Sequence, residues 1–224
     1  MKEIVKEISI MISFILIGIL SRVLLVNQGL QPFPNFEVIT ILTFVGLLLM
    51  RPTFAIMIPI CSLVGSDMII GTPIFVDSSF NRIIMFTYSG IALLGLVGLM
   101  AKNKIKNVNF NLKSIGMFTG LGVGLVLLYD IWTNIGWWYL FYPHTLATLA
   151  TTFVMGLPFM IYHMLSAALT FGIVSIPILY YLNNKSIKDL KYNNIKYENI
   201  YVSCITLILI ILSVVKIWMN LNLK

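Results

Sequence analysis

Charged side chains are scarce in this 224-residue chain, making up 10% of its residues against roughly a quarter in soluble domains. This scarcity excludes an ordinary soluble enzyme. Cysteine is also rare: Cys61 and Cys204 lie inside apolar runs without a CxxC spacing, so neither a disulfide framework nor a zinc knuckle is indicated. The two histidines, His144 and His163, form no HxxxH or HExxH motif, and we predict no metal site.

The short motifs that carry phosphate binding and catalysis are missing as well. The chain has no GxxxxGK[ST] loop, no GxSxG nucleophile elbow, no CxxCH haem site and no GxGxxG opening a helix. We therefore predict no enzyme activity and no cofactor. The formal net charge of +7 reflects basic cytoplasmic loops rather than a nucleic-acid partner.

Hydrophobic residues dominate what is present. They make up 59% of the chain, the mean hydropathy is +0.96, and several apolar runs approach the roughly 20 residues that cross a bilayer. We predict an all-α, polytopic membrane bundle with helices over residues 1–26, 37–50, 53–71, 83–101, 115–134, 158–182 and 200–219. These form a six-helix transmembrane core (1–182), a basic cytoplasmic linker (183–197) and an additional C-terminal transmembrane helix (198–224).

Two of these segments have unusual lengths. The stretch 37–50 is short and is followed by Pro52, so we expect a tilted, half-crossing or bent-back helix there. The stretch 146–182 is too long for one crossing, at about 55 Å if it is wholly helical. Gly156 and Pro158 favour a break, which predicts a separate short helix over 146–156.

The distribution of basic residues predicts the orientation. With the N-terminus inside, every lysine and arginine except Arg22, Arg82, Lys216 and Lys224 lies on the cytoplasmic side. We therefore predict a multi-pass protein of the cell membrane, surrounded by lipid, with a cytoplasmic N-terminus and an external C-terminus.

Two embedded charges lie at similar depth near the outer ends of their helices. Arg22 precedes the end of the first helix by one turn, and Asp67 precedes the end of the third by the same distance. Because a charge in hydrocarbon costs a few kcal/mol, we predict a structural ion pair between them in preference to ligand contact. The alternative is that Arg22 snorkels to the interface and Asp67 caps a turn.

The strongest candidate for ligand binding is the run from Leu128 to His144. Asp130, Asn134 and Trp137 share one helical face, which offers a carboxylate, an amide and a flat ring to an organic molecule. The alternative is an interfacial belt of aromatic anchors that includes Trp138 and Tyr142. His163 either packs on a neighbouring helix through one hydrogen bond or contributes to this cup.

Three further patterns have structural or functional interpretations. The outer loop over 27–36, with Pro34 and Asn35, is either a lid or a stiff turn. Glycines 116, 120 and 124 form a GxxxGxxxG pattern that predicts close approach of another helix. Ser9 and Ser13 form a weaker small-xxx-small pair for contact with a helix of this chain or of a partner.

Three stretches carry a resemblance to a known family: PFPNFEVITILTFVGLLLMRPTFAIMIPICSLVGSDMIIG, LYDIWTNIGWWYLFYPHT and GLPFMIYHMLSAALTFGIVSIP. Over about residues 8–182 the chain resembles the membrane-embedded substrate-binding S components of energy-coupling factor (ECF) transporters, particularly S-component-like proteins of unassigned substrate. The resemblance implies six helices, capture of a vitamin or related micronutrient from outside, and association with a transmembrane coupling subunit and two cytoplasmic ATPases.

The same resemblance implies roles for individual residues. Pro34 and Asn35 would belong to a gating loop, and Asp67 to the outer end of the third helix. Ser9 and Ser13 would take the place of the small residues, often alanines, that contact the coupling subunit. The last helix lies beyond the resemblance.

The sequence thus predicts a substrate-capture subunit for an organic ligand such as a corrinoid or a flavin. The alternatives are a non-catalytic accessory subunit of a larger membrane complex and, third, a membrane enzyme that uses the histidines and acids. The candidate substrate-binding residues are Pro34, Asn35, Asp67, Asp130, Asn134, Trp137, Trp138, Tyr142, His144 and His163.

Overall fold

The computed structural model describes residues 2–27, 38–71, 75–76, 79–105 and 110–184. In chain order the elements are α1 (Lys2–Ser21), the π-helical turn η1 (Arg22–Asn27), α2 (Ile39–Leu49), α3 (Pro52–Ile70), β1 (Phe75–Val76), β2 (Ser79–Phe80), α4 (Ile83–Ile105), α5 (Leu112–Phe141) and α6 (Leu146–Asn184). The predictions about Pro34, Asn35, most of the linker and the helix over 198–224 lie outside the described residues.

Five of these helices are long and apolar enough to cross a membrane. The spans are Ile4–Leu25, Pro52–Ile70, Ile83–Met100, Leu112–Phe141 and Leu146–Tyr180. The predicted all-α class is therefore confirmed for the described residues, with β1 and β2 forming only a two-residue antiparallel pair. Length and apolar composition are those of a multi-pass membrane protein. Six α-helices are described in all. The remaining one, α2, is too short to cross a membrane.

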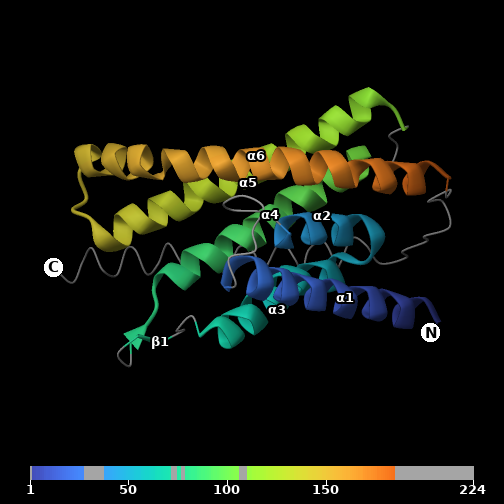
Figure 1. Ribbon diagram of the computed structural model, residues 1–224, viewed down its shortest axis with the longest axis horizontal. Coiled ribbons are helices and arrows are strands. Elements are labelled where there is room, and N and C mark those ends of the chain that lie inside the picture. The colour runs from blue at the N-terminus through green and yellow to red at the C-terminus, as the bar shows by residue number, and fades with distance from the viewer. Residues whose placement is uncertain (1, 28–37, 72–74, 77–78, 106–109, 185–224) are drawn as a thin grey trace.

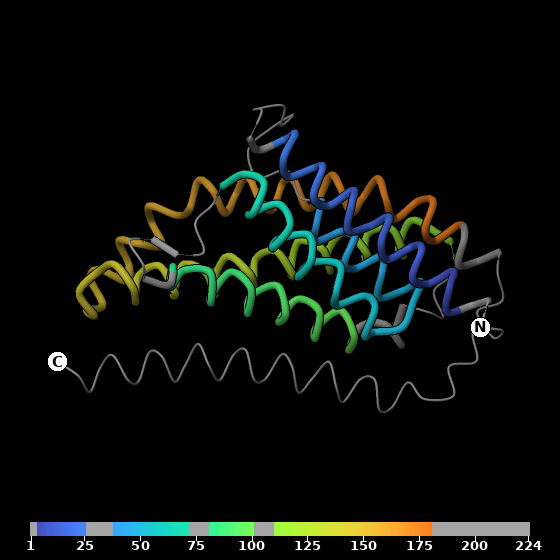
Figure 2. The backbone as a smooth tube through the Cα atoms, turned by 90° about the horizontal axis from the view of Figure 1, so that it is seen from below, coloured from blue at the N-terminus to red at the C-terminus, as the bar shows by residue number. Residues whose placement is uncertain are grey.

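The helices pack in two groups around α2 (Figure 1). α5 packs along α6 and α4, while α1 packs along α3. α2 contacts α1, α3, α4 and α6, so it lies between the groups. Figure 2 shows the same arrangement from below, with α1 and α3 crossing over the layer of α4, α5 and α6.

The short helix predicted over 37–50 is α2, and it forms part of the core. Most of its side chains are buried, and Phe44 meets the rings of Phe118 and Phe171 at centroid distances of 5.3 and 5.5 Å. The helix ends where Arg51 takes the extended conformation that a following proline favours, and Pro52 then opens α3. A helix of 11 residues is roughly 16 Å long, so burial rather than membrane crossing accounts for its apolar sequence.

The predicted break near Gly156 is wrong, because α6 is one helix of 39 residues that contains Pro158. A proline removes one backbone hydrogen bond, but a membrane helix tolerates this loss when neighbouring elements support it. α5 supports α6 on both sides of the proline, through Gly122 against Phe171 and through Asn134 against Gly156. At about 58 Å, α6 is much longer than the roughly 30 Å hydrocarbon core, and Figure 2 shows its bowed path.

The GxxxGxxxG prediction is also not met within the described residues. Nothing described lies within 4 Å of a Cβ built on Gly116, Gly120 or Gly124, and all three are exposed. The close approach occurs instead at Gly122, where a Cβ would overlap the ring of Phe171. Glycine spacing identifies a flat helical face, but it does not determine which face another helix covers.

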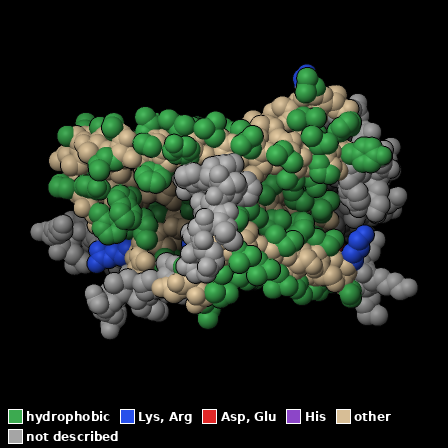
Figure 3. Space-filling view, viewed as in Figure 1, with side chains coloured by type: hydrophobic (Ala, Val, Ile, Leu, Met, Phe, Trp, Pro, Cys, Tyr) green, Lys and Arg blue, Asp and Glu red, His purple; other side chains and the backbone are tan. Residues whose placement is uncertain are grey.

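One end of the bundle lies on the left in Figure 1, opposite the N-terminus of the chain. α4 and α6 begin on this side, and α3 and α5 end there. On the face shown in Figure 3, hydrophobic side chains cover the middle and the visible lysines and arginines lie toward the edges of the molecule. This distribution suits a chain surrounded by lipid along its middle.

Candidate functional site

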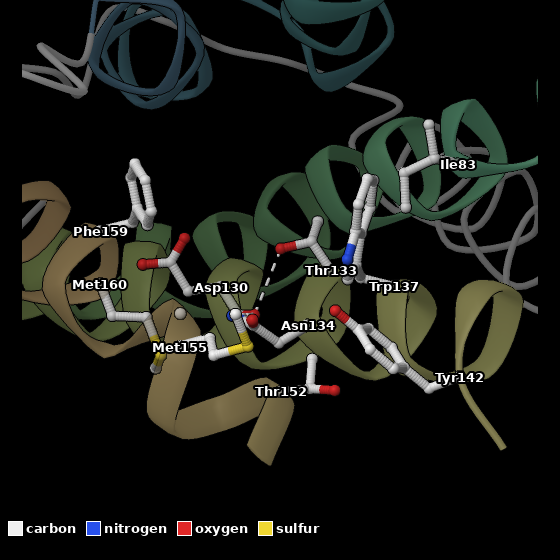
Figure 4. Close-up of a pocket in the computed structure, with 11 residues that line it drawn as sticks. Ile83, Asp130, Thr133, Asn134, Trp137, Tyr142, Thr152, Met155, Phe159 and Met160 are labelled. Carbon is white, nitrogen blue, oxygen red and sulfur yellow. Dashed lines mark hydrogen bonds between the residues drawn. The ribbon is translucent and has the colours of Figure 1, made fainter. Parts of the chain in front are cut away.

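A cavity of about 460 Å³ opens between α5, the first half of α6 and the start of α4. Its volume lies within the range of roughly 300–1,000 Å³ that is typical of sites for small organic molecules. Figure 4 shows its walls. The lining residues are Ile83, Asp130, Thr133, Asn134, Trp137, Tyr142, Thr152, Met155, Gly156, Phe159 and Met160.

The polar wall comes from successive turns of α5. Asp130, Thr133, Asn134 and Trp137 follow one another at intervals of three or four residues, so they share one face of the helix. The structure therefore brings together the three residues that the sequence places on this face. α5 continues to Phe141 and ends where Tyr142 becomes extended before Pro143, and Tyr142 also reaches the cavity.

Asp130 is held in place by His163 of α6. The two atoms His163 Nδ1 and Asp130 Oδ1 are 2.7 Å apart, and both side chains are buried. The imidazole also meets the ring of Tyr129 edge-on, at a centroid distance of 6.1 Å. A buried carboxylate needs hydrogen bonds or an opposite charge, and His163 supplies such a partner from the facing helix. His163 thus packs against a neighbouring helix, as one of the two predicted alternatives had it, and does not line the cavity.

Asn134 of α5 lies against Gly156 of α6 at the cavity. Its Nδ2 donates a hydrogen bond to the backbone carbonyl of Asp130, at 2.8 Å. A Cβ on Gly156 would overlap the Asn134 amide oxygen, so only glycine fits at this position without movement. Gly156, which suggests a helix break when read as sequence, is instead the residue that lets α6 pass over the amide.

The apolar wall combines aromatic rings and thioethers. Trp137 and Phe159 line the cavity and remain 45% and 64% exposed. Trp137 packs against Phe141 at a centroid distance of 4.3 Å. Met155 and Met160 complete the wall from α6 with polarizable, adaptable side chains.

Trp138 and His144 are not among the lining residues because they stabilise the turn between α5 and α6. Trp138 Nε1 donates to Thr148 Oγ1 at 3.0 Å. The His144 ring stacks on Tyr139 with a centroid distance of 4.6 Å, and its Nε2 lies 2.9 Å from the Tyr139 carbonyl oxygen. These contacts fix the corner from which α6 begins.

Asp67 is likewise outside the cavity, in a cluster between η1, α3 and α4. Arg22 forms an ion pair with Asp67, the partner that their matched depths predict, and donates to Ser66 Oγ at 2.8 Å. The Tyr88 hydroxyl donates to Asp67 Oδ2 at 3.0 Å. The carboxylate is thus paired with a permanent cation and acts as a brace between helices.

Sequence reasoning overlooked a second ion pair at the opposite end of the bundle. Arg51 Nε lies 3.4 Å from Glu7 Oε2, and the Glu7 side chain is buried. The sequence does place an acid, Glu7, one turn inside the first apolar run. Its pairing was not predicted because Arg51 follows a helix whose depth in the membrane the sequence does not define.

Sequence reasoning also overlooked the α6 wall of the cavity. Thr152, Met155 and Phe159 recur at intervals of three or four residues, which is the helical signal that could have identified them. The predicted break at Gly156 divided this face between two helices.

No group of three or more histidine, cysteine or acidic side chains that could hold a metal occurs within the described ranges.

Comparison with known families assigns the chain to one of them. Residues 2–190 match the model of a family of unknown function (DUF6580), and the protein belongs to that family. No curated protein matches the chain, and no solved structure matches it either.

Proposed function

We propose that the protein captures a small organic solute in the cavity between α5 and α6, as the substrate-binding subunit of an ECF-type importer of a vitamin or micronutrient. The observation that carries this proposal is the cavity itself, in which polar groups of α5 face aromatic and thioether side chains of α6. Binding sites for small molecules combine such apolar walls with a few placed polar groups.

The position of the cavity supports capture from outside the cell. It lies at the end of the bundle opposite the N-terminus, where α5 ends and α6 begins. The distribution of basic residues predicts that this end faces outward. The proposed subunit performs no catalysis, and a transmembrane coupling subunit with two cytoplasmic ATPases would supply the energy for import.

The cavity volume narrows the range of solutes. A cavity of about 460 Å³ suits a compact organic molecule. A corrinoid is larger than this space, so of the two ligands that the sequence suggests, the flavin is closer in size.

The test is to block the cavity without disturbing the core. Met155 lines the cavity and is 63% exposed, whereas its neighbour Val154 is 70% exposed and is not part of the lining. We expect Met155→Trp to abolish copurification of a bound small molecule, detected by mass spectrometry of detergent-purified protein. Val154→Trp adds the same indole one position away and should retain the molecule. Retention of the molecule in the Met155 variant would exclude this cavity as the site.

A second function is favoured by the exposed surface of α1. Little of the apolar span Ile4–Leu25 is buried, and Val5, Ile12, Leu16 and Leu20 are exposed. Ser9 and Ser13 are on the exposed surface too, with their hydroxyls bonded to the carbonyls one turn back. Such a face suits lipid, the coupling subunit or another membrane partner. Purification in mild detergent separates the cases: an accessory subunit retains a protein partner and carries no solute.

A further inference from the structure

We infer that the captured solute is an uncharged, flat ring compound whose carbonyl or ring nitrogen is hydrogen-bonded by Trp137 and Tyr142. This inference rests on the proposed capture function and adds to it the charge and the recognition chemistry of the substrate. Two observations carry it. The lining residues offer no free partner to an ion, and two of the aromatic side chains keep polar atoms that no other described residue uses.

The residues that line the cavity do not suit a charged solute. They include no lysine, arginine or histidine, so a carboxylate or a phosphate finds no cation among them. Asp130 is their only acid, and its carboxylate is engaged elsewhere, since Oδ1 lies 2.7 Å from Nδ1 of His163 and Oδ2 is buried. An ion that leaves water without a partner loses its solvation free energy, so this cavity favours an uncharged solute.

Two aromatic side chains of the lining retain hydrogen-bonding capacity. The indole N–H of Trp137 has no hydrogen-bond partner among the described residues, whereas those of Trp132 and Trp138 on the same helix donate to hydroxyl groups at 2.9 and 3.0 Å. The Tyr142 hydroxyl likewise has no partner within the described ranges. An indole donates only, and a phenol both donates and accepts, so together they suit a carbonyl or a ring nitrogen.

The placement of these polar atoms favours a ring with one polar edge. In the view of Figure 4, the indole nitrogen of Trp137 and the hydroxyl of Tyr142 point toward the side of the site where Asn134 lies. Met155 and Phe159 contribute apolar surface from α6. A flat ring system can place its polar edge against the two donors and its remaining surface against the apolar side chains, which is the usual composition of a small-molecule site.

The inference is tested with three probes that share a flat bicyclic ring and differ in charge: 2-quinolinone, quinoline-2-carboxylate and N-methylquinolinium. Their affinities are measured by isothermal titration calorimetry on the full chain in detergent, with the heat of titration into protein-free detergent subtracted. We expect the uncharged 2-quinolinone to bind at least about tenfold more tightly than either ion, because neither ion gains a partner of opposite charge.

Two substitutions test the hydrogen bonds. Trp137→Phe and Tyr142→Phe each remove one polar group and keep an aromatic ring, so each should weaken binding of 2-quinolinone by about three- to tenfold, as the loss of one hydrogen bond implies. Tyr162→Phe is the matched control, because it removes a hydroxyl from an exposed side chain that does not line the cavity. Neither tyrosine hydroxyl has a hydrogen-bond partner among the described residues, so both tyrosine variants should fold normally.

The outcomes separate the two proposals. The inference is overturned if an ion binds as tightly as 2-quinolinone, or if Trp137→Phe and Tyr142→Phe leave its affinity unchanged, as interfacial anchors would. An equal loss of affinity in Tyr162→Phe overturns it as well, because the effect then does not arise in the cavity. If a copurifying solute is lost in Met155→Trp, yet that solute is charged or 2-quinolinone does not bind, the capture function stands and this assignment is wrong. If no probe binds and nothing copurifies, both proposals fail.

Discussion

The contact between His163 and Asp130 makes a quantitative prediction about stability. His163→Phe keeps an aromatic ring at the interface of α5 and α6 but removes the nitrogen that lies 2.7 Å from the Asp130 carboxylate. Loss of one partner of a buried ionic pair costs about 3–5 kcal/mol. The side chains retain 8% and 10% exposure and the cavity is adjacent, so we expect about 3 kcal/mol, the lower end of that range.

This loss corresponds to roughly a hundredfold change in the folding equilibrium. For a chain of this size it lowers the unfolding temperature by roughly 6–12 °C. The assay is the fraction of monodisperse protein that remains after heating in detergent. The double variant Asp130→Leu/His163→Phe replaces the whole pair by apolar groups and should recover most of the loss, because no buried charge is left behind.

The single variant Asp130→Leu completes a double-mutant cycle, which provides the decisive comparison. Strong coupling, with the double variant more stable than His163→Phe alone, is the expected result. If the two single effects simply add, the histidine does not stabilise the carboxylate and the argument for an oriented Asp130 fails.

Two further predictions concern packing and orientation. Gly122→Leu should abolish recovery of monodisperse protein because the leucine side chain would overlap Phe171. Gly120 faces open space, so Gly120→Leu should be tolerated. Equal yields of the two variants in size-exclusion chromatography would contradict the contact between Gly122 and Phe171. In intact cells, a membrane-impermeant maleimide should label Arg82→Cys and not Lys6→Cys, each made in a background without native cysteines. Both side chains are exposed, and they lie at opposite ends of the bundle. The reverse labelling pattern would invert the predicted topology.

Most of the membrane-spanning pattern was predictable because it depends on local quantities. Hydrophobic length identifies the long helices, and charge at matched depth was enough to pair Arg22 with Asp67. The shared face of Asp130, Asn134 and Trp137 follows from helical periodicity alone, and all three line one cavity. In each case the relevant neighbours lie on one helix or at a depth that the sequence itself defines.

The wall contributed by α6 was not predictable in the same way, because it depends on a contact between helices. Gly156 and Pro158 indicate a break when the segment is considered alone. They are compatible with one continuous helix because Asn134 occupies the space where a Gly156 side chain would lie, and because α5 supports both halves. The same limitation applies to Gly122, whose role becomes visible only when Phe171 is placed against it.

Asp67 and Asp130 are two buried acids with different partners. Asp67 is matched to Arg22, which remains charged under all physiological conditions, so the pair is neutral and braces η1 against α3. Asp130 is matched to His163 of the facing helix, and it stands in the wall of a cavity. A carboxylate needed only for packing would be better stabilised by a permanent cation, as Asp67 is. The two carboxylates therefore differ in their surroundings, because Asp67 lies in a packed cluster between helices and Asp130 lies beside a cavity.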